Sequence, residues 1–81
     1  MVDDAETAIL ALLAERAAGK TICPSEAARQ LDREDWRAQM DRVRDAGIRL
    51  AAAGAIDVTQ KGVPVDPHAA KGPIRYRKVV C

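Results

Sequence analysis

Few side chains in this sequence are of the types that perform covalent chemistry. Ser25 is the only serine, His68 is the only histidine, and the two cysteines are Cys23 and Cys81. Ser25 lacks the flanking glycines of a nucleophile elbow. A Cys23–His68 dyad is conceivable, because Cys23 directly precedes a predicted helix whose N-terminus would favour the thiolate. The plainer interpretation is favoured, namely a small apolar cysteine and a solvated loop histidine.

Metal and cofactor sites also lack a supporting pattern. Two distant cysteines and one histidine are too few ligands for a zinc site, and no glycine-rich phosphate loop occurs. Paired carboxylates such as Asp3-Asp4 and Glu34-Asp35 stand at the starts of predicted helices, where helix electrostatics already explains them. We therefore expect no enzyme activity, no metal and no cofactor.

Charge is distributed unevenly along the chain. The 81 residues carry a formal net charge of +1. Residues 1–58 hold eight Lys/Arg and eleven Asp/Glu, a net charge of −3, whereas residues 59–81 hold five and one, a net charge of +4. A basic end on an acidic body indicates an anionic partner for that end. An ordinary charged hairpin surface explains the pattern equally well.

Composition and termini restrict the class of protein. The longest strictly apolar run, Ala8 to Ala14, is far too short to span a membrane, and the acidic start is unlike a secretory or mitochondrial signal. Two distant cysteines are typical of free thiols in a reducing compartment. We expect a single cytoplasmic domain over residues 1–81.

Apolar periodicity predicts three helices, over residues 4–18, 24–31 and 35–53. Asp3 or Asp4 can cap the first helix, Pro24 suits the first position of the second, and Gly54 can end the third. Strands are predicted over residues 20–23, 55–61 and 74–79. Residues 62–73 contain three prolines and two glycines and are predicted to form a loop.

The same patterns predict the core, in which Trp36 is the single large anchor. Its members are expected to be Ile9, Leu12, Leu13, Ile22, Leu31, Trp36, Met40, Val43, Leu50, Ile56, Val58, Ile74 and Tyr76. The order of elements predicts an α+β, mainly α, fold of the winged helix-turn-helix type, with three helices, a small antiparallel sheet and residues 62–73 as the wing. A three-helix bundle with a disordered tail fits less well, because residues 55–61 and 74–79 alternate regularly.

Several motifs also carry a family resemblance. They are Lys20-Thr21-Ile22-Cys23-Pro24-Ser25-Glu26, Asp35-Trp36-Arg37, Thr59-Gln60-Lys61-Gly62 followed by Pro64-Val65-Asp66-Pro67, and Lys71-Gly72-Pro73-Ile74-Arg75. With these motifs the chain resembles, over nearly its whole length, a small bacterial domain-of-unknown-function family with a winged-helix fold. The resemblance implies a fold and no activity.

Duplex DNA is the partner that this fold and charge pattern favour. The third helix would enter the major groove, where Arg42 and Arg49 could reach bases or phosphates. Asp41 and Asp45 share that face at pairing distance from the arginines, so a self-neutralised, solvated face explains these charges as well.

The hairpin offers a cleaner set of cations. Its residues Lys61, Arg75 and Arg77 share an outward parity with Thr59, and only Asp57 opposes them. With Lys71 in the wing, the predicted phosphate contacts are Lys61, Lys71, Arg75 and Arg77. A sheet edge protected by charge is the plainer interpretation.

The alternative function is a protein-docking module without DNA binding. The third helix is nearly neutral, and Ile48 is expected to be exposed on its flank. Single-stranded RNA is disfavoured because Trp36 lies on the apolar seam and Tyr76 faces inward, which leaves no aromatic stacking platform.

Overall fold

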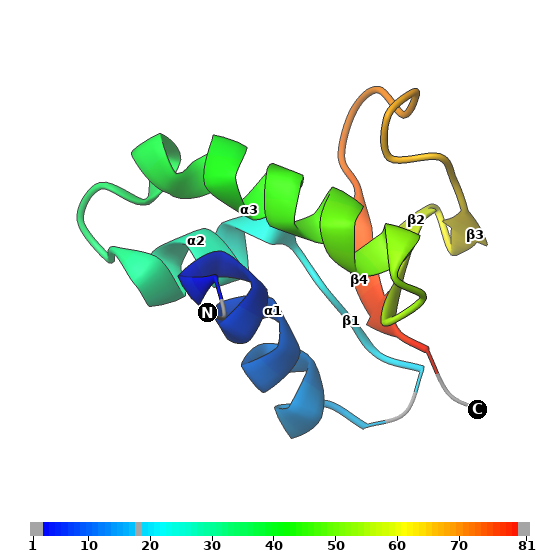
Figure 1. Ribbon diagram of the computed structural model, residues 1–81, viewed down its shortest axis with the longest axis horizontal. Coiled ribbons are helices and arrows are strands. Elements are labelled where there is room, and N and C mark those ends of the chain that lie inside the picture. Colours follow the sequence, from blue (N-terminus) through cyan, green and yellow to red (C-terminus); the bar gives the residue numbers. More distant parts are fainter. Residues whose placement is uncertain (1–2, 18, 80–81) are drawn as a thin grey trace.

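Three helices and a four-stranded antiparallel sheet make up the fold, seen in a computed structural model that describes residues 3–17 and 19–79 (Figure 1). The elements are α1 (Asp4–Glu15), β1 (Thr21–Ile22), α2 (Pro24–Leu31), α3 (Trp36–Ala52), β2 (Ile56–Gln60), β3 (Val63–Pro64) and β4 (Arg75–Lys78). The α+β, mainly helical class predicted from the sequence is confirmed. The helices and the three predicted strands lie where periodicity placed them; α2 has the predicted bounds, and the other elements are shorter than predicted.

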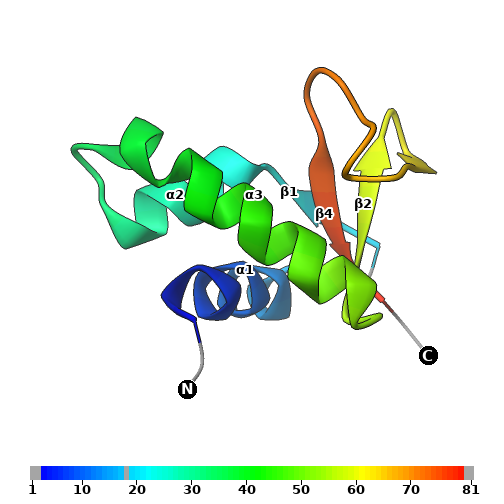
Figure 2. The ribbon, with the colours of Figure 1, turned by 45° about the horizontal axis from the view of Figure 1, so that its top comes forward.

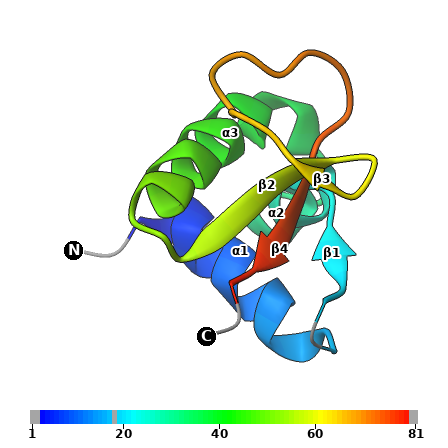
Figure 3. The same cartoon turned by 90° about the vertical axis from the view of Figure 1, so that its right-hand side faces the viewer.

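The sheet has the strand order β1-β4-β2-β3, so β4 lies between β1 and β2. Tyr76 is opposite both Ile22 and Val58 in the register. These three side chains are buried in one core cluster with residues of the helices, so they share the inner face of the sheet. The helices lie behind the sheet in Figure 3. Residues of the opposite parity, such as Arg75 and Arg77, therefore lie on the outer face.

α1 begins at a carboxylate cap. Asp3 Oδ1 accepts hydrogen bonds from the backbone N–H groups of Ala5 at 2.8 Å and Glu6 at 3.4 Å. The helix ends at Glu15, earlier than predicted; residue 18 lies outside the described residues. Arg16 leaves the helix in an extended conformation and its Nη2 lies 2.6 Å from Glu26 Oε1 of α2. A tertiary ion pair thus accompanies the early end of the helix.

Asp3→Ala is expected to lower the melting temperature near neutral pH, since two N–H groups of α1 lose their acceptor. The backbone hydrogen bond from Ala5 is the main cause that holds the pKa of Asp3 below its ordinary value. A depressed pKa means that this stabilisation is present above the ordinary value of about 3.9 and is lost as the pH falls below it. The melting temperatures of Asp3→Ala and wild type should therefore become equal in acid. Asp4→Ala is the matched control, and an equal loss in that variant would contradict the assignment.

α3 ends in a Schellman motif at the predicted glycine. Gly54 has a φ of +77°. Its N–H donates to Ala51 O at 3.0 Å, and the N–H of Ala55 donates to Leu50 O at 2.9 Å. These two bonds satisfy carbonyls that the end of a helix leaves free, and glycine adopts the required conformation without strain.

Eight of the thirteen predicted core residues are buried: Ile9, Leu13, Ile22, Val43, Leu50, Ile56, Val58 and Tyr76. The other five, Leu12, Leu31, Trp36, Met40 and Ile74, are partly buried against them. Alanines of the three helices complete the core (Ala5, Ala8, Ala27, Ala28 and Ala46). Periodicity thus predicted the apolar face of each helix and strand correctly, but not how deeply each residue is buried.

Trp36 was wrongly predicted as the central anchor. It is half-buried at the first position of α3, where the guanidinium carbons of Arg29 and Arg37 each lie 4.6 Å from its ring centroid. The largest fully buried side chain is Tyr76, which is 1% exposed. A residue at the end of an apolar seam has fewer neighbours than one on a central strand, which explains the difference.

The prediction of an uninterrupted loop over residues 62–73 was also wrong, because Val63–Pro64 forms β3. Lys61 and Gly62 have φ values of +52° and +80°, the pattern of a tight type I′ hairpin turn. This turn sets Val63 opposite Gln60 on β2. The remaining connection, the 65–74 loop, projects from the same end of the sheet as this turn (Figure 2). The side-chain amide of Gln60 donates to Lys71 O and ties the loop to β2.

Candidate anion-binding site

A groove of about 1040 Å³ lies between the start of α2, the exposed side of α3 and the 65–74 loop. The β1–α2 junction contributes Cys23, α3 contributes Met40 and Arg44, and the β2–β3 turn and the 65–74 loop form the opposite wall. Residues far apart in the sequence thus meet at one surface, because the sheet carries the hairpin and the loop alongside α3.

The charged residues that line this groove are all cations: Arg44, Lys61, Lys71 and Arg75. Each is exposed. In the part of the chain that the structure describes, none of the four lies in an ion pair. Like charges around a concave surface reinforce one another's potential, so the groove attracts anions. We refer to these four residues as the cation rim.

Arg75 is held in place without being neutralised. Its Nε donates to Thr21 Oγ1 at 2.5 Å, its Nη2 donates to Thr21 O at 3.4 Å, and its Nη1 lies 3.1 Å from Cys23 Sγ. Thr21 lies on β1 and Cys23 directly follows this strand, so the guanidinium of Arg75 extends from β4 toward β1. Hydroxyl and carbonyl acceptors carry no formal charge, so Arg75 keeps its positive charge for a ligand.

Arg77, predicted to act with Arg75, is separated from the groove. It lies opposite Asp57 in the β2–β4 register, and its Nη2 is 3.2 Å from Asp57 Oδ2. Cross-strand pairs of opposite charge stabilise a sheet modestly. The positive charge of Arg77 is therefore largely balanced within the protein, unlike that of its neighbour Arg75.

Arg49 is likewise balanced by acids of another helix. Its Nη2 lies 3.5 Å from Asp3 Oδ2 and its Nε lies 3.6 Å from Glu6 Oε2, both at the start of α1. Spacing along α3 had predicted pairing with Asp45. Over residues 3–17 and 19–79, Asp45 forms no such ion pair with Arg49 or Arg42. Acids of α1 are closer than the helix's own acids, so tertiary packing decides the pairing.

Arg42 also lies apart from the cation rim. Its Nη1 donates to Gln39 Oε1 at 3.0 Å, and its charge contributes to the lowered pKa of Asp3 at the start of α1. Arg42 and Arg49 thus occupy the α1 side of α3, whereas Arg44 points to the groove. Sequence analysis did not select Arg44, and only the position of the 65–74 loop identifies its side of α3 as part of a site.

Thr59 has the outward parity predicted for it, since it lies opposite Arg75 in the β2–β4 register, but it is buried. The residue is 2% exposed, lies opposite Pro64 of β3, and donates from Oγ1 to Arg75 O at 3.5 Å. Of the predicted outward residues, Thr59 is therefore not available to a ligand, whereas Arg75 on β4 and Lys61 in the turn are exposed.

Nucleophilic and metal-binding side chains are dispersed. Cys23 lines the groove, whereas His68 lines a separate hollow beside the end of α3, so the conceivable dyad does not share a cavity. Within the described ranges, no group of three His, Cys, Asp or Glu is arranged to hold a metal ion. Cys81 lies outside the described residues. None of the described helices is both long and apolar enough to cross a membrane.

Two comparisons with known proteins concern the chain as a whole. A family model described as "Protein of unknown function (DUF3253)" matches residues 3–79. A search of curated proteins finds no match. The resemblance to a small family of unknown function, noted from the motifs, is thereby confirmed over nearly the whole chain.

Proposed function

Because the chain belongs to the DUF3253 family of unknown function, we propose its role from its surface: it binds duplex DNA through phosphate contacts at the cation rim. The observation that carries this proposal is the convergence of Arg44, Lys61, Lys71 and Arg75 on one groove, whose lining includes no carboxylate from residues 3–17 and 19–79. A phosphate backbone supplies closely spaced negative charges to match it.

The arrangement of elements supports a winged-helix interpretation. In it α3 is the recognition helix and the 65–74 loop is the wing, and the groove lies between them. Apart from the additional strand β3, the order of helices and strands is the predicted one, and the β2–β4 pair is antiparallel as a wing requires. The two elements that contact DNA in such proteins thus lie next to each other and share the cation rim.

This proposal changes the set of residues expected to contact DNA. Lys61, Lys71 and Arg75 are retained, and Arg44 takes the place of Arg42 and Arg49. Arg77 is left out because Asp57 already balances its charge. Phosphate contacts of this kind give affinity and orientation without reading base sequence. The proposal is for a binding protein of transcription-regulator type, without catalytic turnover of its own.

Salt dependence of binding to a random duplex tests the proposal. Release of counterions from about four phosphates predicts a log–log slope near −3.6. Arg75→Gln and Arg44→Gln should each flatten that slope by about 0.9, one contact's worth, and weaken binding uniformly across sequences. Fluorescence anisotropy at several salt concentrations gives both quantities.

Matched controls come from the same elements. Arg77→Gln changes the neighbouring outward position of β4, and Arg49→Gln changes another arginine of α3, but both side chains are already paired with acids. Both controls should leave the slope within error of wild type. Equal flattening by controls and test variants, or no binding at low salt, would reject the cation rim as a DNA site.

A protein-docking module is the second candidate. The groove also presents apolar side chains, and the most exposed of them is Val63 at 61%. A phosphate backbone gains no affinity from this apolar surface, whereas an acidic peptide with apolar side chains would gain affinity by burying it. Ile48, expected to be exposed, is instead half-buried and faces the 65–74 loop. Val63→Ser should leave DNA affinity unchanged and weaken a docked peptide.

A further inference from the structure

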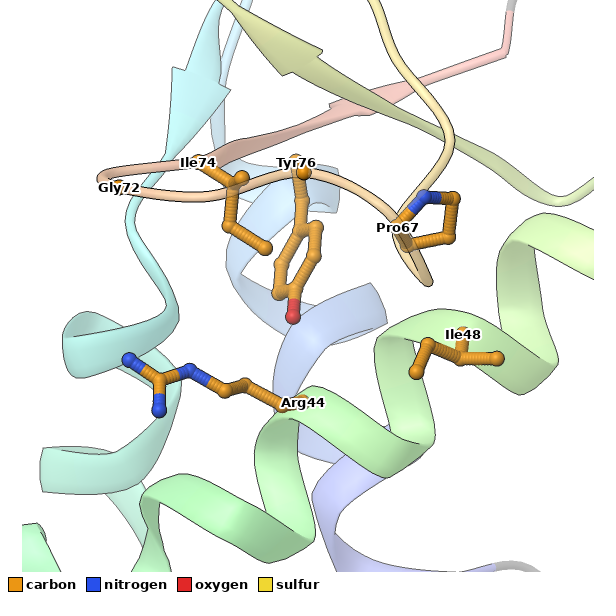
Figure 4. A pocket seen from close by; sticks show the side chains of 7 residues that line it. Arg44, Ile48, Pro67, Gly72, Ile74 and Tyr76 are labelled. Atoms are coloured by element: carbon orange, nitrogen blue, oxygen red, sulfur yellow. The ribbon is translucent and has the colours of Figure 1, made fainter.

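A second, smaller cavity of about 340 Å³ lies beneath the 65–74 loop, between that loop and α3. Figure 4 shows its side chains: Arg44 and Ile48 come from α3, Pro67 and Ile74 come from the loop, and the ring of Tyr76 points between them. Its volume is at the lower end of the range for small-molecule sites, about 300–1,000 Å³.

Polar and apolar atoms contribute about equally to the surface of this cavity. The polar side chains that line it are those of Arg44 and Tyr76, and the apolar surface comes from residues such as Ile48, Pro67 and Ile74. Arg44 has no acidic partner among the described residues. The Tyr76 hydroxyl donates only a long hydrogen bond, 3.5 Å to Val43 O. The cavity therefore combines hydrocarbon walls with one available cation and one weakly engaged hydroxyl.

The Tyr76 hydroxyl is protonated at neutral pH. Burial raises the pKa of Tyr76 to about 12, and the nearby charge of Arg44 acts in the opposite direction. Tyr76 is therefore a neutral hydroxyl that donates a hydrogen bond. Guanidinium is always charged and forms paired hydrogen bonds to carboxylates. Arg44 is therefore the group of this cavity that would pair with an anionic oxygen.

We propose that this cavity binds a small apolar monocarboxylate. Its carboxylate would pair with Arg44, and its hydrocarbon would lie against Ile48, Pro67 and Ile74. An inorganic anion would leave these walls in contact with water, and a neutral hydrocarbon would leave Arg44 without a counter-charge. This cavity shares Arg44, Gly72 and Ile74 with the groove, so a bound carboxylate would occupy one cation of the cation rim. Binding of a small carboxylate in the absence of DNA tests this site apart from the proposed DNA binding.

Methyl NMR of isoleucine-labelled protein tests the proposal with hexanoate as the probe. Ile48 and Ile74 line the cavity, whereas Ile9 and Ile22 belong to the core. Hexanoate should shift the Ile48 and Ile74 methyl signals saturably and leave those of Ile9 and Ile22 unchanged. Hexylamine and hexanol have the same chain without the negative charge and should cause no saturable shift.

Arg44→Gln should weaken hexanoate binding by about tenfold or more, the loss typical of a charge-assisted hydrogen bond. Arg44 is exposed, so this variant should fold, and unchanged Ile9 and Ile22 signals would verify that. Arg42→Gln, on the α1 side of the same helix, should bind as wild type does.

Three results would overturn the proposal. One is the absence of a saturable hexanoate shift at Ile48 and Ile74. Another is an equal response to hexylamine or hexanol, which indicates apolar contact alone. The third is unchanged hexanoate affinity in Arg44→Gln, which removes the guanidinium from the site.

Discussion

Gly47→Ala is expected to destabilise the protein by about 1–3 kcal/mol or more, the cost of overpacking a core. A Cβ at position 47 would overlap the Tyr76 hydroxyl oxygen and lie 2.5 Å from Tyr76 Cζ. The Tyr76 ring is buried between α3 and the sheet, so it has little space to retreat. In an unobstructed helix the same change would stabilise by about 0.5–1 kcal/mol. Denaturant unfolding should therefore show that Gly47→Ala lowers the free energy of unfolding, whereas the same change in an unobstructed helix would raise it.

A double-mutant cycle provides the control. In a Tyr76→Leu background the ring that meets the new methyl group is gone, so Gly47→Ala should cost much less or even stabilise. Coupling of this kind is expected for residues in contact. Equal destabilisation in both backgrounds would show that the glycine is needed for another reason.

Tyr76→Ala should cost about 3–5 kcal/mol, the range for removing a fully buried aromatic ring. Domains are stabilised by about 0.05–0.15 kcal/mol per residue, so this loss would unfold much of so short a chain. Trp36→Ala should cost less, because Trp36 is half-buried and its ring faces two arginines. Sequence analysis alone predicts the opposite ranking. Thermal and denaturant unfolding of both variants decide between the two.

Tyr76→Phe separates the ring from its hydroxyl. The hydroxyl makes only a 3.5 Å hydrogen bond, so this variant should lose little stability. A Trp36→Ala variant that unfolds as readily as Tyr76→Ala would restore Trp36 as the anchor. The position of Tyr76 also bears on function, because its ring packs β4 against α3 and so sets the distance between Arg75 and Arg44.

Local patterns in the sequence determined the elements and their inner faces. Three helices and three strands follow from periodicity, and Asp3 and Gly54 mark helix ends because their side chain or conformation acts on the adjacent backbone. The family resemblance likewise rests on contiguous motifs. All of these features depend on neighbours within a few residues, which the sequence displays directly.

Only the tertiary structure decided which cations remain available and which aromatic ring is the anchor. Arg49 meets the acids of α1, and Arg77 meets Asp57 across the sheet, whereas Arg44 comes to lie beside the 65–74 loop. Periodicity predicts the face on which a side chain lies but not what packs against that face. Charge balance and depth of burial depend on distances between segments remote in the chain, and those distances are set only when the helices pack on the sheet.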